Sequence, residues 1–163
     1  MLAASHFIIG SAVGRMSGHP LLAAFLGFAT HFLADMVPHW DLGYGFRKNL
    51  RSYILVAIDL VVGLAVIIAI GYFRGFDRTL FLNVLIGGFF GLVPDFIGFG
   101  AKILKIKPLE WYVRYHEKLH WFIKEERPPL EEFRTLPVTK RSFFFGLLWQ
   151  GLIALGSLYI LWL

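Results

Sequence analysis

The segment HFLADMVPHWD, residues 31–41, places two histidines and two aspartates in a strongly apolar part of the chain. His31, Asp35 and His39 follow one another at i, i+4 and i+8, so they share one face for as long as a helix lasts. A charged side chain costs roughly 2.5–3.5 kcal/mol at the centre of a bilayer on insertion scales. Such residues are retained in apolar helices where they bind a ligand or pair with each other, and this set predicts a metal site.

The same segment allows plainer interpretations. His31 and Asp35 could form a hydrogen-bonded pair within the membrane, in which the carboxylate holds the imidazole. Pro38 should end the helix, because the residue before a proline avoids helical geometry, so that His39 and Asp41 fall in the loop beyond it. Asp41 is then a metal ligand, a partner that orients an imidazole, or a helix N-cap.

The composition indicates the class of protein. Of the 163 residues, 57% are hydrophobic and only 17% are charged, which is too little polar surface for a soluble domain of this length. We therefore predict a single integral membrane domain over residues 1–163. The chain has no cysteine, so disulfides and thiolate ligands are excluded, and a metal would have to bind histidine, carboxylate or water. The net charge of +5 comes from basic residues between apolar segments, which favours membrane lipids over nucleic acid as the partner.

The apolar segments predict an all-α fold, a polytopic bundle of about five membrane helices. They cover residues 2–15, 20–36, 53–73, 80–101 and 143–163. The first two are short enough to form a hairpin that crosses the membrane only in part. Residues 108–126 carry apolar side chains at helical spacing and predict one amphipathic interfacial helix. Ten basic residues between Lys102 and Arg141 place the 102–142 helix and connector on the cytoplasmic side of the plasma (inner) membrane.

This topology brings ionisable residues that are far apart in the sequence to one leaflet of the membrane. They are His6, His31, Asp35, Asp59, Asp95, His116 and His120. The spacing of His116 and His120, at i and i+4, lets two imidazoles reach one ion. Glycines on the same helix faces, such as Gly10 after His6 and Gly91 before Asp95, predict close contacts between these helices. We therefore expect the polar side chains to converge.

Each of these residues also has a structural alternative. His6 could simply face the membrane interface, and His116 with His120 could be an interfacial pair. Asp95 follows a proline, so its carboxylate could cap a break in the helix instead of binding a metal. Asp59 lies deepest in the predicted bundle, and we expect it to be either a ligand or a base that handles protons.

These motifs resemble those of the membrane-bound metal-dependent hydrolase family, the DUF457 or YdjM-like proteins of the inner membrane. The matching pieces are Ser5-His6, the HxxxDxxPHxD pattern from His31 to Asp41, Pro94-Asp95, and the HxxxH pair of His116 and His120. The HxxxD core is also distantly similar to the zinc motif of bacterial phospholipase C and P1-type nucleases, which are all-helical zinc enzymes. The resemblance implies a membrane hydrolase whose metal ligands are His6, His31, Asp35, His39, Asp41, Asp95, His116 and His120.

The chemistry expected of such a set is metal-dependent hydrolysis. The candidate ligands exceed what one tetrahedral zinc ion needs, so we expect one or two ions of zinc or another divalent metal, two of them about 3.5–4 Å apart. The ions would activate water for attack on a phosphoester or lipid head group at the cytoplasmic interface, with Asp59 or Glu117 moving the proton. The alternatives are a small proton-coupled transporter and a non-catalytic membrane scaffold with a structural metal.

Overall fold

The computed structural model describes residues 1–39, 50–120 and 140–163, with side chains from residue 143 onward in the last range. These ranges contain six α-helices and no strand, so the predicted all-α class is confirmed for the described residues. The helices are α1 (Ala3–Met16), α2 (Pro20–Asp35), α3 (Leu50–Phe73), α4 (Arg78–Leu104), α5 (Glu110–Leu119) and α6 (Lys140–Trp162), with a short 3-10 turn, η2 (Lys107–Leu109), before α5.

Three helices are long and apolar enough to cross a membrane. They are Leu50–Phe73, Arg78–Leu104 and, within α6, Phe143–Trp162. α2 is apolar but shorter, and α1 has 14 residues, so the predicted count of five apolar membrane helices is not confirmed. Helix α5 starts and ends inside the predicted 108–126 segment, whose last residues lie outside the described ranges.

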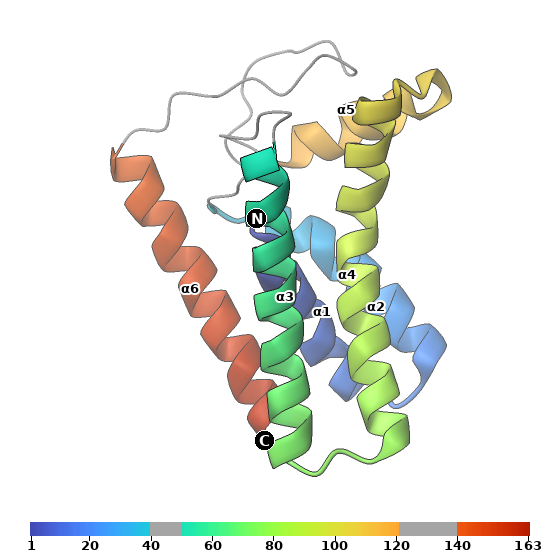
Figure 1. Ribbon diagram of the computed structural model, residues 1–163, viewed down its shortest axis with the longest axis vertical. Coiled ribbons are helices and arrows are strands. Elements are labelled where there is room, and N and C mark those ends of the chain that lie inside the picture. Colours follow the sequence, from blue (N-terminus) through green and yellow to red (C-terminus); the bar gives the residue numbers. More distant parts are fainter. Residues whose placement is uncertain (40–49, 121–139) are drawn as a thin grey trace.

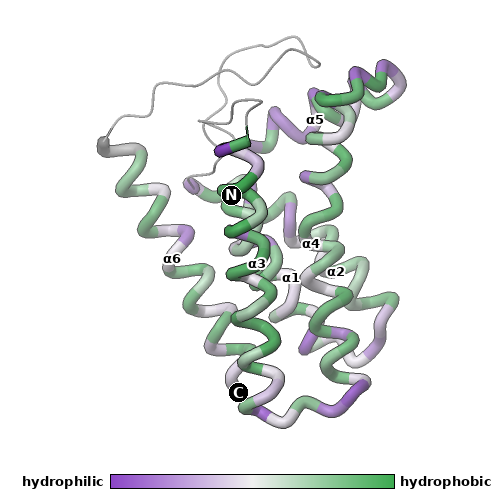
Figure 2. The backbone as a smooth tube through the Cα atoms, viewed as in Figure 1, coloured by the Kyte–Doolittle hydropathy of each residue, from purple (hydrophilic) through white to green (hydrophobic). Residues whose placement is uncertain are grey.

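The outer surfaces of α3 and α6 are apolar along their length. Figure 2 shows hydrophobic residues dominating both helices, whereas hydrophilic residues gather at the ends of the bundle and in α5. Large side chains such as Ile58 and Val61 on α3 and Leu152 and Leu155 on α6 are exposed. Three possible spans with this surface are what an integral membrane protein presents to lipid.

Helix α1 lies at the centre of the fold, in contact with α2, α3, α4 and α6 (Figure 1). It packs backbone against backbone on α4, because glycines face each other there: a Cβ placed on Gly10 would overlap the carbonyl of Gly87. A Cβ on Gly91 would lie 2.7 Å from the carbonyl oxygen of His6. The predicted glycine faces are therefore contacts between helices, as in the small-residue packing of membrane bundles.

The ends of the helices are set by local capping. The His19 ring accepts a hydrogen bond from the Leu21 amide (3.2 Å) and starts α2, with Pro20 at the first helical position. Asp77 caps α4 by accepting from the Leu80 amide at 2.8 Å. Helix α5 lies across one end of the bundle, against the C-terminal part of α4 (Figure 1).

Candidate metal centre

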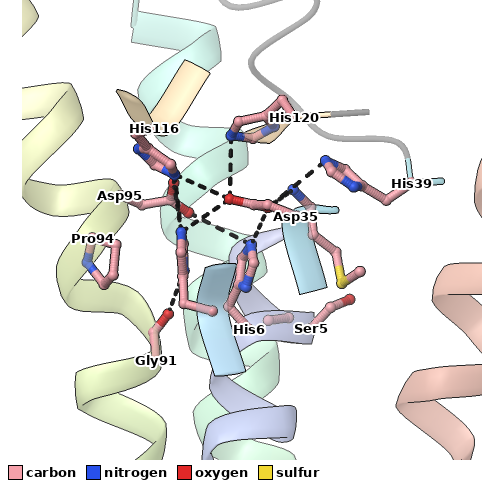
Figure 3. Close-up of polar contacts among 12 residues, drawn as sticks. Ser5, His6, Asp35, His39, Gly91, Pro94, Asp95, His116 and His120 are labelled. Atoms are coloured by element: carbon pink, nitrogen blue, oxygen red, sulfur yellow. Dashed lines mark hydrogen bonds and ion pairs between the residues drawn. The ribbon is translucent and has the colours of Figure 1, made fainter. Parts of the chain in front are cut away.

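Asp35, the last residue of α2, is the hub of a group of histidines at this end of the bundle (Figure 3). Its side chain has no exposed surface. Five imidazole Nε2 atoms surround its two carboxylate oxygens, at 3.1 Å (His6), 3.1 Å (His31), 3.8 Å (His39), 3.0 Å (His116) and 3.2 Å (His120). These are five of the six histidines in the chain, and the sixth caps α2. The predicted convergence therefore occurs, around one carboxylate.

Four of the residues form a group whose spacing suits a single ion. His31, Asp35, Asp95 and His116 each offer one atom within 4.8 Å of the others. The His31 and His116 Nε2 atoms lie 3.0 Å apart, and Asp95 Oδ1 lies 3.7 Å and 3.6 Å from them. Tetrahedral zinc with bonds of about 2.0–2.2 Å needs donors about 3.3–3.6 Å apart. The separations of 3.0–3.7 Å lie on either side of that range, within a few tenths of an ångström of it.

In His31 and His39, a hydrogen bond made by Nδ1 determines that Nε2 faces the group. His31 Nδ1 lies 2.7 Å from the Gly91 carbonyl oxygen, and His39 Nδ1 lies 2.7 Å from that of Val37. Because a carbonyl only accepts, each Nδ1 is assigned as the protonated donor, which turns the Nε2 lone pair of a neutral ring toward Asp35. A backbone carbonyl that orients an imidazole in this way is the usual outer partner of a metal-binding histidine.

A second group shares Asp35 with the first. It consists of Asp35, His39 and His120, again with donor atoms within 4.8 Å of one another. His6 lies between the two groups, with Nε2 3.1 Å from Asp35 Oδ1 and 3.9 Å from Asp95 Oδ2. This nitrogen makes no hydrogen bond, and its ring stacks on that of His31 with centroids 4.0 Å apart. His6 belongs to neither group, but its Nε2 could donate a lone pair to an ion held beside Asp35.

Contacts between α4 and α5 position Asp95 and His116, the donors on these two helices. The Tyr112 hydroxyl donates to the Pro94 carbonyl oxygen at 2.9 Å, which joins α5 to α4 one residue before Asp95. Gly98 leaves room for His116, because a Cβ there would lie 3.2 Å from the His116 Nδ1 atom. Burial raises the pKa of the Tyr112 phenol, and the Asp95 and Asp35 carboxylates add to this effect, so the hydroxyl remains a donor.

Three residues of the predicted set are not placed among the donors. Asp59 accepts a hydrogen bond from the Ala4 amide at 3.1 Å and so holds the start of α1. Glu117 forms an ion pair with Lys102. Asp41 lies outside the described residues. The catalytic roles of Asp59 and Glu117 stay predictions.

Several contacts of the group were not expected from the sequence. The N-terminal amine of Met1 lies 3.3 Å from Asp35 Oδ1. Gln150 of α6 donates to the Ser5 hydroxyl at 2.9 Å, next to His6, and its polar side chain within an apolar segment is a signal that could have found it. Tyr112 precedes His116 by one helical turn on the same face, which is a similar signal. The carbonyl partners of His31 and His39 leave no signal in the sequence.

The chemistry of this buried group requires cations. The Asp35 and Asp95 carboxylates lie 3.0–3.9 Å from the inward-facing nitrogens of the imidazoles, so protons or a metal ion must separate these groups. Nitrogen and oxygen donors from four helices, α1, α2, α4 and α5, could hold a divalent metal ion. Comparison of the chain with family models, with curated proteins and with solved structures gives no match.

Proposed function

We propose that this chain is a membrane-embedded metal-dependent hydrolase. The observation that carries the proposal is the buried Asp35 carboxylate with five imidazoles around it, in a chain with three possible membrane spans. Ionisable groups are costly at such a place and are retained for binding or catalysis. The resemblance to membrane-bound metal-dependent hydrolases supports the same function.

The two groups offer different numbers of donors to a bound metal. His31, Asp35, Asp95 and His116 offer four protein donors, which is the full tetrahedral set of zinc. The group of Asp35, His39 and His120 offers three, which leaves a position for water, as in catalytic zinc sites. A divalent ion held there would supply acidified water and charge stabilisation for a phosphoryl oxygen.

We expect water and substrate to reach the donor atoms from the side of the group on which Asp95 lies. The Asp95 side chain is 35% exposed, compared with 8% for His116 and 12% for His120. Asp95 is therefore the carboxylate in this set that is best placed to exchange protons with solvent. Exposed Arg114 and Lys118 on α5 carry positive charge at the same end of the bundle and would attract an anionic substrate.

These features lead to the proposed substrate and location. The substrate is a phosphoester, either a lipid head group or a small amphipathic molecule, and the site lies at the cytoplasmic face of the plasma membrane. The basic residues between Lys102 and Arg141 support this orientation.

A phosphodiesterase assay on purified protein tests the proposal. Zinc-loaded wild type should hydrolyse a phosphodiester presented in mixed micelles, while chelated protein and Asp35→Asn should not. Gly100→Ala is a matched control, because a Cβ at Gly100 meets nothing within 4 Å. Protein that binds metal without hydrolysing phosphoesters would favour a structural metal, for which the four-donor group is the supporting observation.

A further inference from the structure

Helix α5 carries the donor His116, and the donor His120 is the residue that caps its C-terminal end, but the helix is only ten residues long. Isolated helices shorter than about 12–15 residues are marginal in water. Its place in the fold therefore depends on contacts with the rest of the bundle, mainly with α4. Those contacts decide whether the two imidazoles reach Asp35.

The contacts lie along one stripe of α4. Asp95, Gly98 and Lys102 are spaced at i, i+3 and i+7 and so share a face. Asp95 Oδ1 lies 3.6 Å from His116 Nε2, Gly98 accommodates the His116 ring, and Lys102 pairs with Glu117.

The ion pair differs from an ordinary surface pair. The side chains of Lys102 and Glu117 are each only 16% exposed, so both charges are largely removed from water. Breaking a largely buried pair by neutralising one partner leaves the other charge uncompensated, which costs more than the loss of an exposed pair. Because Glu117 follows His116 directly, a displacement of Glu117 displaces a donor.

We propose that Lys102, Glu117 and Tyr112 are positioning residues that fix α5 on α4 and thereby set the affinity of the metal centre. The inference rests on the proposed metal-dependent function. It gives Glu117 a role through His116, because its carboxylate is engaged by Lys102. The Tyr112 hydroxyl supplies the second fixed point, by its hydrogen bond to the Pro94 carbonyl oxygen.

Cobalt titration of the metal-free full chain in detergent, followed by its visible absorption, tests the inference without an activity assay. Lys102→Gln and Glu117→Gln should each bind Co²⁺ about tenfold or more weakly than wild type, as outer partners of metal ligands typically do when changed. The double variant Lys102→Glu with Glu117→Lys restores opposite charges and should recover most of the affinity. Lys118→Gln is the matched control, because it removes the same charge from an exposed position on α5 and should bind as wild type does.

The outcomes separate this inference from the proposed function. Wild type that binds no Co²⁺ overturns both. Wild type that binds Co²⁺ while Lys102→Gln and Glu117→Gln bind it equally well overturns the positioning role alone. So does a charge-swapped double variant that binds no better than either single variant.

Tyr112→Phe provides an independent test if the charge variants fail to fold. It removes one hydroxyl and keeps the buried ring, so the packing of α5 is retained. Weaker Co²⁺ binding with an unchanged far-ultraviolet circular dichroism spectrum supports the inference, and wild-type binding contradicts it.

Discussion

Replacing Gly91 by alanine should push apart two helices that build the candidate metal centre. A Cβ at this position would lie 2.7 Å from the His6 carbonyl oxygen, whereas ordinary contact begins near 3.4 Å. Both atoms belong to or adjoin rigid helical backbone, so α1 and α4 must separate locally by about 0.7 Å. His6 lies on one helix and Asp95 on the other, and His31 is held by the Gly91 carbonyl, so the donors would lose their common spacing.

The loss of folding stability caused by Gly91→Ala can be estimated, and a control variant separates it from the gain in helix propensity. Overpacking of this kind destabilises a protein by about 1–3 kcal/mol. Gly100→Ala in the same helix has the same propensity gain, up to about 1 kcal/mol, but its Cβ meets nothing within 4 Å. Thermal unfolding in detergent and metal content by mass spectrometry should show Gly91→Ala less stable and depleted of metal, with Gly100→Ala at least as stable as wild type and fully loaded. A Gly91→Ala protein with wild-type stability and metal content would refute the packing argument.

Three further outcomes are expected. His39→Ala removes a donor of the three-residue group only, so it should lower the number of metal ions bound per chain without abolishing binding. Complete loss of metal would show that the two groups do not bind ions independently. Asp59→Ala should cost about 1 kcal/mol in thermal unfolding, because the start of α1 loses a capping carboxylate, and should leave metal content unchanged; loss of hydrolysis at unchanged stability would instead support the predicted proton role of Asp59. Because burial raises the pKa of Tyr112, its phenol should stay protonated at pH 10, where an ordinary tyrosine is half ionised. The stability that this proton contributes is therefore present below pH 10 and lost as the pH rises through the higher pKa of the folded state. Ultraviolet titration of wild type and Tyr112→Phe should give equal phenolate absorbance at pH 10, and a larger signal from wild type would contradict the burial of this hydroxyl.

The helices were largely predictable because their apolar runs end at strong local signals. Segment 80–101 corresponds to α4 (Arg78–Leu104), which Asp77 caps after a glycine turn at Gly75 with φ +62°. Which helices span a membrane was less predictable, since α1 and α2 are apolar but short. The position of α1 at the centre of the bundle is a tertiary property that hydropathy alone does not give.

The donors were predictable to the extent that they follow helical spacing. His31 with Asp35 and His116 with His120 are one turn apart, so each pair is visible in the sequence. The role of Asp35 as the hub was not visible, because it depends on the angles at which four helices meet. The contact of Asp59 was not visible either: its carboxylate accepts a hydrogen bond from the Ala4 amide at the start of α1, 55 residues away in the sequence.

The partner of Glu117 was likewise not visible in the sequence. Its carboxylate pairs with Lys102, and its role in moving a proton stays a prediction. The pairing depends on how the η2 turn directs α5 back across α4, and periodicity within α5 carries no information about that direction. Opposite charges on either side of the Lys107–Leu109 turn were the available signal.

The most direct test of the metal centre is the metal content of the protein purified without chelator. Wild type should retain one or two divalent ions per chain through dialysis, and Asp35→Asn should retain none, because every histidine of the group meets at this carboxylate. Gly100→Ala, purified in parallel, should match wild type. Wild type free of metal, or an Asp35→Asn protein with the same metal content, would contradict the account.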